Sequence, residues 1–367
     1  MTSPLPSDHY PFTSVNISPG NPPDLKRVTW KSPSNIALVK YWGKKPVQIP
    51  TNASISFTLD HAHTITSVEP TVRKGDVPFI TFSFEGSKAP AFAQRIERFF
   101  TSLFPIMPWV EKFTWEIESE NSFPHSSGIA SSASSMSALA LCLCDLESQI
   151  AGQELAYADF YKKASYIARL GSGSAARSVF PKLASWGGHE HIVDSTNLYA
   201  TPHVGVAPVF STFHDDIIIV SKEKKSVSSS AGHQLMETNP FASTRYQQAN
   251  EHLSSLLQCM KEGDLSSFGK IVEDEALTLH ALMMCSNPSY ILLEPNTLEI
   301  IKRIRSFRAK TGLHVYFTLD AGPNVHILYP DYQKENISAF IQEDLLSLAE
   351  DGQIIKDQIG EGPQKLL

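Results

Sequence analysis

The sequence predicts an α+β protein of two layered domains, and three observations support this class. Its 367 residues are enough for two domains with substantial cores. Stretches in which apolar and polar residues alternate are interleaved with stretches whose apolar residues recur every three or four positions. A loop-like segment near residue 205, TPHVGVAPVF, precedes the strand-like DDIIIVSK and marks the predicted domain boundary. Strands and helices mixed in this way are typical of layered α+β domains.

The N-terminal half is predicted to contain an arm followed by the first domain, residues 27–205. Residues 1–26 are rich in Pro and Ser and are expected to form an extended arm. Strands are predicted from about Arg27 through NIALVKYW, and in SISFTLD, FITFSFEG and KFTWEIESEN. Helices are predicted in AFAQRIERFFTSLF, in MSALALCLCDLESQ and in DFYKKASYIARL, which ends before Gly171.

The second domain is predicted to span residues 206–367. Its helices are expected in QQANEHLSSLLQCMKEG, DLSSFGKIVEDEALTLHALMM and NTLEIIKRIRSFRAKTG. The third of these opens with Asn296 and Glu299, spaced as in a capping box, and ends at Gly312. Two strands, HVYFTLD and VHILYP, flank a tight turn at residues 321–324.

Composition narrows the classes of partner. The formal charge of −7 comes without an acidic block or a basic stripe, so no nucleic-acid partner is expected. The first residues lack a basic segment followed by an apolar one, and no apolar run reaches about 18 residues, so a cytoplasmic protein without a membrane partner is expected. The four cysteines lack zinc-ligand spacing and are expected to be buried thiols in a reducing compartment.

Residues 123–134, FPHSSGIASSAS, lead from a predicted strand directly into a strongly apolar helix. A helix N-terminus exposes unpaired N–H groups, and small side chains allow an oligophosphate to approach them. The segment lacks the lysine of the GxxxxGK[ST] loop. The residues alone therefore leave two alternatives, a phosphate-binding loop and a serine-rich helix cap.

Three further segments contain residue types suited to chemistry. GSGSAARS, residues 171–178, combines glycines and hydroxyls with Arg177, a donor suited to carboxylate or phosphate, although a turn with a surface arginine fits as well. Asp320 ends a strand-like run, where it either faces a cleft or only shapes the turn. Lys40 lies in an apolar strand pattern, where it is either buried with a charged partner or extended to the surface.

The histidines give weaker signals. His189 and His191 in GGHEHI suggest a metal site, but no third ligand is evident, and surface histidines are commoner. His280 lies beside apolar residues of a predicted helix and is expected to be packed rather than catalytic. The sequence therefore does not identify the metal ligands.

Taken in order, NIALVKYWGK, PTNASISFTLD, ENSFPHSSGIASSAS, GSGSAARS and FTLDAGPNV strongly resemble the diphosphomevalonate decarboxylases of the GHMP kinase superfamily. The resemblance covers nearly the whole chain from about residue 27. KYWGK and DAGPNV together are specific to the decarboxylase branch, whereas the Gly/Ser loop indicates only the superfamily. The resemblance to this family implies an N-terminal domain like ribosomal protein S5 domain 2, a ferredoxin-like C-terminal domain, and an active site in the cleft between them.

The resemblance also implies a reaction in which ATP and mevalonate 5-diphosphate give isopentenyl diphosphate, carbon dioxide, ADP and phosphate, with Mg²⁺ as cofactor. A homodimer is a further expectation from the family. The residues implied are, for catalysis, Asp320, Arg177 and Lys40; for substrate binding, Tyr41, Ser172, Ser174, Ser228 and Ser229; and for ATP binding, Ser126, Ser127, Gly128, Ser131 and Ser132.

This sequence departs from the family pattern around the 5-diphosphate subsite. Gln48 stands where an asparagine is expected, and Lys88 or Arg95 would have to replace an arginine. SVFPKLASWG replaces a Gly-Gly version of the same segment. The alternatives are therefore a decarboxylase of mevalonate 5-phosphate, a 3-kinase that stops at phosphorylation, and a non-catalytic binding protein on the same scaffold. Retention of Asp320, Arg177 and Lys40 argues against the last two.

Overall fold

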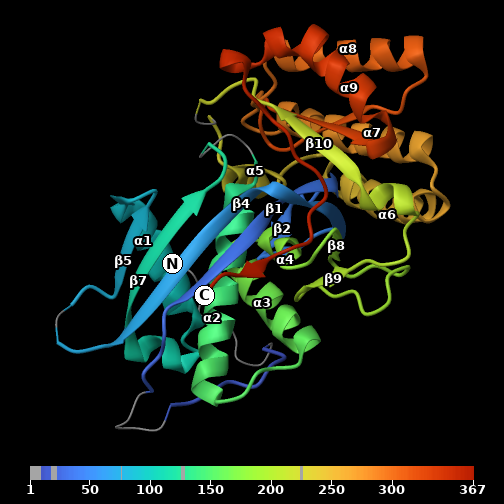
Figure 1. Ribbon diagram of the computed structural model, residues 1–367. Coiled ribbons are helices and arrows are strands. Elements are labelled where there is room, and N and C mark those ends of the chain that lie inside the picture. The colour runs from blue at the N-terminus through green and yellow to red at the C-terminus, as the bar shows by residue number, and fades with distance from the viewer. Residues whose placement is uncertain (1–9, 18–22, 76, 125–128, 224–225) are drawn as a thin grey trace.

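The computed structural model describes residues 10–17, 23–75, 77–124, 129–223 and 226–367. Two β-sheets, each covered by helices, form an N-terminal and a C-terminal layered unit that pack against each other (Figure 1). The predicted α+β class with two domains is confirmed. Among the helices of the described ranges, none combines the length and apolar character that a membrane span needs.

The N-terminal sheet has the order β14-β1-β4-β7-β5-β6, and β8 and β9 extend it from β4. Neighbouring strands are antiparallel except for the parallel pair β5 and β7. The strands are β1 (Val28–Val39), β4 (Ser54–Val72), β5 (Ile80–Phe84), β6 (Ser87–Lys88), β7 (Phe113–Asn121), β8 (Leu183–Trp186), β9 (Ala200–Pro202) and β14 (Gln364–Lys365). The helices are α1 (Pro90–Leu103), α2 (Ser131–Ala151), α3 (Tyr157–Gly171) and the short α4 (Ala175–Ser178), and β2 (Lys44–Lys45) pairs with β3 (Ile49–Pro50).

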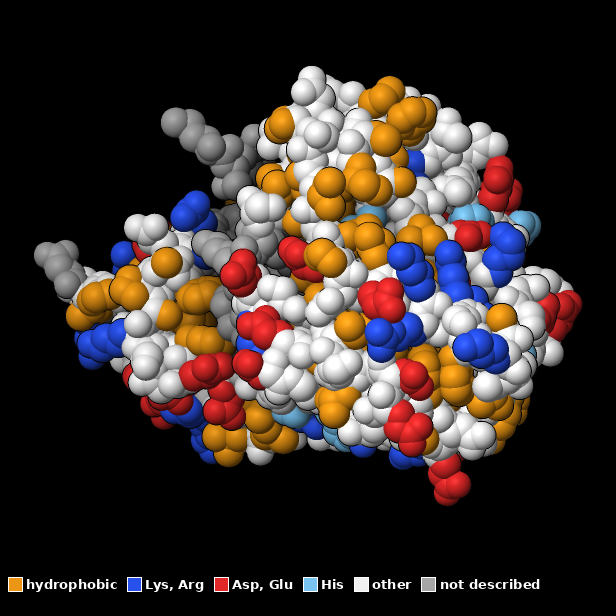
Figure 2. Space-filling view, turned by 90° about the horizontal axis from the view of Figure 1, so that it is seen from above, with side chains coloured by type: hydrophobic (Ala, Val, Ile, Leu, Met, Phe, Trp, Pro, Cys, Tyr) orange, Lys and Arg blue, Asp and Glu red, His pale blue; other side chains and the backbone are white. Residues whose placement is uncertain are grey.

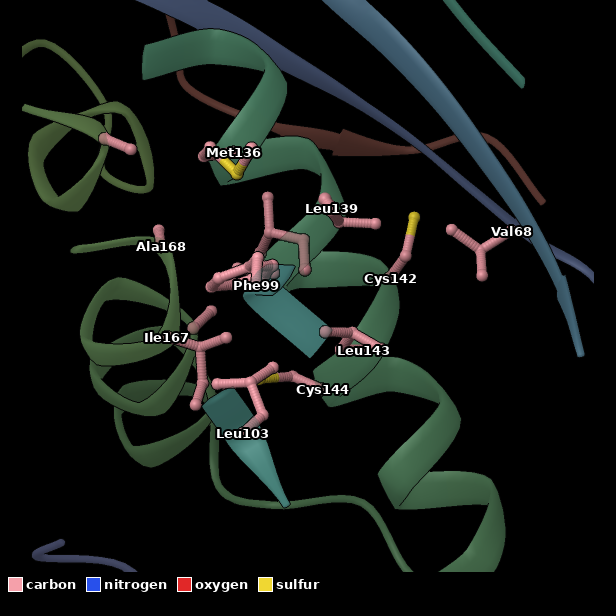
Figure 3. Packing of buried hydrophobic residues seen from close by; sticks show 14 of the residues in the cluster. Val68, Phe99, Leu103, Met136, Leu139, Cys142, Leu143, Cys144, Ile167 and Ala168 are labelled. Atoms are coloured by element: carbon pink, nitrogen blue, oxygen red, sulfur yellow. The ribbon is translucent and has the colours of Figure 1, made fainter. Parts of the chain in front are cut away.

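Helix α2 is the centre of the N-terminal core. Its side chains reach Val68 of the sheet on one side and Phe99, Leu103 and Ile167 of α1 and α3 on the other (Figure 3). A helix with packing partners on several sides must be apolar nearly all round, which explains the run MSALALCLC. The predicted helix in this segment is confirmed and begins earlier, at Ser131.

The strands β1 and β4 are buried on both faces where the two units meet. Residues Ser32–Ala37 of β1 are buried almost without interruption, as are Ser54–Leu59 of β4, whereas β7 alternates buried and exposed positions. Leu38 and Phe57 pack against C-terminal residues such as Phe268 and Leu328. Burial on both faces explains why these stretches contain continuous apolar and small residues instead of strict alternation.

The C-terminal unit contains a four-stranded antiparallel sheet in the order β11-β12-β10-β13. One sheet face packs against α6, α7 and the N-terminal sheet, and the other packs against α8 and α9. The strands are β10 (Phe213–Ile218), β11 (Tyr316–Leu319), β12 (Val325–Pro330) and β13 (Ile354–Ile355). The helices are α5 (Ser229–Leu235), α6 (Ala242–Glu262), α7 (Leu265–Met284), α8 (Pro295–Thr311) and α9 (Lys334–Phe340).

Both ends of the described chain contact the N-terminal unit. The C-terminal strand β14 pairs with β1, with Lys365 opposite Trp30, and the red end of the chain lies beside the blue strand in Figure 1. Tyr10 and Phe12 of the predicted arm pack against the N-terminal core, where their rings contact Tyr166. The last residues of the predicted C-terminal domain thus belong to the N-terminal sheet. The predicted domain boundary near residue 205 stays a prediction.

Two local predictions were wrong. Helix α8 begins at Pro295, and its capping box joins Glu294 and Thr297 rather than Asn296 and Glu299. Proline fixes the backbone for the first helical turn, so the cap moves to the residue before it. The side chain of Asn296 instead donates to the Leu348 carbonyl.

The cysteine prediction also needs correction. Cys142, Cys144 and Cys259 are buried, as expected, but Cys285 is exposed. Cys285 directly follows α7, where the chain leaves the helix, and this position could not be inferred from the apolar spacing of the helix.

An ion-pair network is buried between the two units. Glu275 of α7 has no exposed surface and accepts hydrogen bonds from Arg245 and His252 of α6 and from the backbone N–H of Lys40 at 2.8 Å. Burial would raise the pKa of Glu275, but the hydrogen bond from His252 and the Arg245 charge lower it to about 2. The network ties α6 and α7 to the end of β1.

On the face shown in Figure 2, Lys and Arg side chains are interspersed with Asp and Glu side chains. The charges on that face are therefore mixed rather than gathered into a single-sign patch.

We expect the substitution Gly360→Ala to destabilise the fold. A Cβ at Gly360 would lie 2.2 Å from the Leu59 carbonyl oxygen, and this backbone neighbour cannot move aside cheaply. The free energy of unfolding in urea should fall by about 1–3 kcal/mol. Gly188→Ala is the matched control, because its Cβ meets nothing closer than 3.8 Å, and it should change stability by less than about 0.5 kcal/mol. Equal stability of the two variants would contradict the packing described.

Glu275 should also contribute to the acid sensitivity of the protein. Its pKa is depressed in the folded state, so its contribution to stability is present above the ordinary value of 4.5 and is lost as pH falls toward about 2. Glu275→Gln should therefore remove part of the pH dependence of the unfolding free energy in this window. Glu251→Gln, which changes an exposed carboxylate of α6, should leave it unchanged. A wild-type slope in the Glu275 variant would contradict the assignment.

Candidate active site

The two units enclose a cavity of about 400 Å³. Its walls come from β1 and the segment after it, α1, the start of α2, residues 171–174 with α4, α5, α7 and the turn after β11. The described residues that the family resemblance implied for catalysis, substrate binding and ATP binding all line it: Lys40, Tyr41, Ser131, Ser132, Ser172, Ser174, Arg177, Ser228, Ser229 and Asp320. Segments far apart in the sequence thus face one small space.

Lys40 directly follows β1, and its side chain is only 2% exposed. Its ammonium donates to the Ala37 carbonyl and, at 2.8 Å, to Thr318 Oγ1 of β11. Burial lowers the pKa of Lys40 to about 8, while nearby carboxylates, Asp320 foremost, oppose this fall. Lys40 is therefore buried rather than extended to the surface, and both units hold it.

Arg177 lies on α4 and is buried, which excludes the surface arginine that the sequence had left open. Its guanidinium donates to Ser56 Oγ at 2.9 Å, to Ser54 Oγ and to Asn35 Oδ1. Burial lowers the pKa of Arg177 to about 10, against the opposing effects of Tyr41 and Asp320. These hydrogen-bond partners are neutral, so the guanidinium suits an anionic ligand in the cavity.

Asp320 occupies the turn after β11 and forms part of the cavity wall. Its carbonyl oxygen accepts hydrogen bonds from the Gly322 N–H at 2.8 Å and from His280 Nε2 at 3.0 Å. His280 is buried in α7, as its apolar neighbours predicted, and it holds the backbone of the turn in place. The position of Asp320 is therefore fixed by α7 as well as by the turn.

The two small-residue loops meet in the cavity. Ser132, at the start of α2, lies 3.2 Å from Ser172 through their hydroxyl oxygens, and Ser172 lies 3.5 Å from Ser174. Ala130 has a left-handed conformation with φ of 44°, so the chain turns sharply before the helix begins. No side chain caps this N-terminus within the described residues, so its N–H groups suit an anion. Three further predicted residues lie outside the described part of the chain: Ser126, Ser127 and Gly128.

Helix α5 brings Ser228, Ser229 and a histidine that sequence reasoning missed to the same cavity. His233 packs against the Tyr41 ring, with centroids 4.4 Å apart, and its Nδ1 accepts the Gly43 N–H at 2.9 Å. Burial foremost, together with the charge of Lys44, lowers the pKa of His233 to about 3, so the imidazole is neutral. His233 ends the sequence segment VSSSAGH, residues 227–233, and nothing in the spacing of that segment indicates a buried ring.

Tyr41 carries an unsatisfied polar group. Its hydroxyl is buried without a hydrogen-bond partner among the residues that the structure describes, and burial raises its pKa. A buried phenol normally finds a partner, so this one is suited to bond a ligand in the cavity.

One end of the cavity is cationic. Lys44 and Arg95 both line it, and Lys44 donates to Gln48 Oε1 at 3.0 Å. Burial lowers the pKa of Lys44, and the charge of Arg95 lowers it further. The sequence offered Lys88 and Arg95 as substitutes for an arginine of the family pattern. Arg95 lines the cavity, whereas Lys88 lies exposed on β6. The sequence predicted no role for Lys44, although this residue follows directly after the KYWG motif.

A smaller apolar pocket of about 70 Å³ lies beside the cavity and shares Ser131, Ser132 and Arg95 with it. Its apolar lining comes from β5, α1, β7 and α2: Phe82, Phe84, Phe92, Ile96, Ile117, Met136 and Leu139. A flat apolar group attached to an anion at the start of α2 would fit this arrangement.

A histidine metal site receives no support. His191 is exposed, and His189 lies near the Asn250 carbonyl at 3.1 Å. Across the described ranges, no group of three or more His, Cys, Asp and Glu side chains is placed to hold a metal ion. A magnesium ion carried by phosphates needs few protein ligands, so the serine hydroxyls and Asp320 fit such an ion.

Comparison with known proteins gives matches to both parts of the chain. Residues 32–197 match the diphosphomevalonate decarboxylase-like N-terminal domain, and residues 216–365 match the mevalonate 5-diphosphate decarboxylase C-terminal domain. The diphosphomevalonate decarboxylase of Debaryomyces hansenii is 31% identical over 326 residues, which cover 84% of this chain and 79% of that protein.

Solved structures agree with these matches. Mevalonate diphosphate decarboxylase from Staphylococcus aureus superposes with a TM-score of 0.79 at 28% identity, covering 94% of this chain and 98% of that one. A structure described as MDDEF in complex with MVAPP, AMPPCP and magnesium has a TM-score of 0.78 at 27% identity, covering 93% and 98%. With both of its halves matched, and with these relatives, the chain belongs to the diphosphomevalonate decarboxylase family.

Proposed function

We propose that this protein catalyses the ATP-dependent decarboxylation of mevalonate 5-diphosphate to isopentenyl diphosphate, with release of ADP, phosphate and carbon dioxide. One observation carries the proposal: Lys40, Arg177 and Asp320 face one cavity together with the serines of both loops. Family membership supports it, and the neighbouring structure described with MVAPP, AMPPCP and magnesium supports the same ligands here.

ATP is proposed to bind across the start of α2. Ser131 and Ser132, with residues 126–128, would hold its phosphates, since helix N–H groups and hydroxyls are donors to anions. The apolar pocket beside them would take the purine ring. Mg²⁺ would be held by phosphate oxygens with Ser132, Ser172 or Asp320, and it would neutralise charge during phosphoryl transfer.

The remaining residues are proposed to act on the substrate. Asp320 accepts the proton of the tertiary 3-hydroxyl as that oxygen attacks the γ-phosphorus of ATP, which gives the 3-phosphate and ADP. Loss of that phosphate with its C–O electron pair is accompanied by cleavage of the C–C bond to the carboxylate, which releases carbon dioxide and forms the double bond. Arg177 holds the carboxylate in line, since its hydrogen bonds in the described structure go to neutral hydroxyl and amide oxygens.

The ammonium of Lys40 is proposed to stabilise negative charge next to Asp320 and the substrate carboxylate. Tyr41, Ser172, Ser174, Ser228 and Ser229 complete the substrate pocket. For Tyr41 the supporting observation is its buried hydroxyl, which has no hydrogen-bond partner in the described part of the chain and which a substrate oxygen would satisfy.

The cationic end of the cavity is proposed to hold the 5-diphosphate. Lys44 and Arg95 supply charge there, and Gln48 supplies an amide. This arrangement favours the diphosphate over the 5-phosphate as substrate, because two cations face that end of the pocket. A cytoplasmic location and a homodimer, expected from sequence composition and from the family, are kept as proposals.

The direct test is to supply ATP, Mg²⁺ and, separately, mevalonate, its 5-phosphate and its 5-diphosphate, and to measure ADP and carbon dioxide. Equal amounts of both products from the 5-diphosphate are expected. ADP without carbon dioxide would instead indicate a kinase, and carbon dioxide from the monophosphate alone would select the monophosphate decarboxylase. Neither product with any substrate would indicate a binding protein.

Asp320→Asn should abolish turnover while sparing binding. Loss of the proton acceptor is expected to lower kcat by about 10²–10⁴-fold, and dissociation constants for substrate and for a non-hydrolysable ATP analogue should change little. Asp274→Asn, which removes a surface partner of Lys270, is the control and should keep wild-type kcat. A nearly normal kcat in the Asp320 variant would remove this carboxylate from the mechanism.

Arg95→Met should weaken the diphosphate subsite. Loss of one charge-assisted contact is expected to raise KM for mevalonate 5-diphosphate about tenfold, with a smaller effect on kcat, since the reacting end of the substrate is unaffected. Arg98→Met is the matched control on the same helix, because Arg98 does not line the cavity. Equal KM values for the two variants would place the diphosphate elsewhere.

A further inference from the structure

The C-terminal sheet presents polar side chains on the face that packs against the N-terminal unit. Asp215 of β10, Thr318 of β11 and His326 of β12 share this face with apolar residues such as Ile217 and Leu328. Thr318 lies directly opposite His326 in the strand register, and Ile217 lies opposite His326 on the other side. Alternation along the strands therefore places all three polar side chains in one layer.

Asp215 and His326 form a buried pair within that layer. Both side chains are 2% exposed, and His326 Nδ1 lies 2.8 Å and 3.0 Å from the two carboxylate oxygens. A buried carboxylate is costly unless hydrogen bonds and charges compensate it. Neither residue lines the cavity, so neither touches the substrate in the proposed function.

The pair lies behind Lys40. The Lys40 ammonium donates to Thr318 Oγ1 at 2.8 Å, next to His326 in the register, and it is attracted by the Asp215 carboxylate. Among the described residues, three more elements supply charged groups that act on this ammonium: Asp320 in the turn after β11, Glu275 on α7 and Arg177 on α4.

These carboxylates have different surroundings. Asp320 lines the cavity, where substrate binds in the proposed function, and Glu275 is already paired with Arg245 and His252. Asp215, with His326 as its partner, supplies a negative charge behind the ammonium that substrate cannot reach.

We propose that Asp215 and His326 are positioning residues of the decarboxylation site, which keep the buried Lys40 ammonium charged and in place; this inference rests on the proposed function. His326 orients the Asp215 carboxylate, Asp215 stabilises the ammonium from behind, and Thr318 Oγ1 fixes its direction. The residues proposed to act in the cavity would then depend on a pair that lies outside it.

The chain provides a matched control in the next residue. Asp216 is also 2% exposed, but it points to the opposite face of the sheet, where Tyr329 donates to it at 2.9 Å. Asp215→Asn and Asp216→Asn therefore remove equally buried carboxylates from neighbouring positions, and only the first faces Lys40.

The test is the pH profile of kcat/KM for carbon dioxide release by the full-length variants. If protonated Lys40 is required, activity falls as pH rises through its pKa, and loss of Asp215 moves this alkaline limb to lower pH by about 1 unit. At alkaline pH this is a loss of about tenfold, with little change on the acid side. Asp216→Asn should keep the wild-type limb. Coincident limbs for wild type and Asp215→Asn would overturn the proposal.

Variants of His326 test the proposal independently of Asp215→Asn, and they still do so if that variant does not fold. His326→Gln retains a donor for Asp215 and should keep most of kcat, whereas His326→Leu should lose about tenfold or more of it at equal thermal stability. Equal kcat in the two variants would contradict the positioning role. A wild-type protein that releases no carbon dioxide would instead contradict the proposed function itself, so the two failures are distinguishable.

Discussion

The arrangement depends on one buried charge, the ammonium of Lys40, at the junction of the two units. A lysine in a low-dielectric environment is stable only if oxygens and negative charges compensate it. Here the compensation comes from both sides: the Ala37 carbonyl belongs to β1, and Thr318 belongs to β11. The backbone N–H of Lys40 is in turn held by Glu275 of α7. The chain segment that carries the charge is thus fixed by the same contacts that join the units.

The rest of the cavity follows the same physical logic. Arg177 is held by neutral hydroxyl and amide oxygens. Among the residues that the structure describes, the Tyr41 hydroxyl has no hydrogen-bond partner and no side chain caps the start of α2. Each of these groups can still donate a hydrogen bond to a ligand, and leaving that bond unmade within the protein costs some stability. Groups oriented in this way need little reorganisation when an anionic substrate and its charged transition state enter, which is how preorganised sites lower a barrier.

The sequence predicts the parts of the structure that depend on local chemistry. The helices of the N-terminal core, the strands that flank Asp320, and the two small-residue loops follow from periodicity and turn residues. It does not predict features that arise only when distant segments meet. His233 is a neutral cavity residue because it is buried against Tyr41 and lies near Lys44. Asp215 acts on Lys40 because the sheets that contain β10 and β1 pack against each other. The cap of α8 was missed for a local reason, since Pro295 moved it to Glu294.

The central claim is that Lys40 is a buried, titratable ammonium shared by both units, and ¹⁵N NMR of the lysine Nζ resonances tests it most directly. The Lys40 signal can be assigned as the one lost in Lys40→Arg and followed from neutral to alkaline pH. The account predicts that the Lys40 ammonium titrates with a pKa of about 8. It also predicts that mevalonate 5-diphosphate shifts this resonance, since the ammonium lines the cavity in which the substrate is proposed to bind. A midpoint at the ordinary value of 10.5, unmoved by substrate, would contradict it.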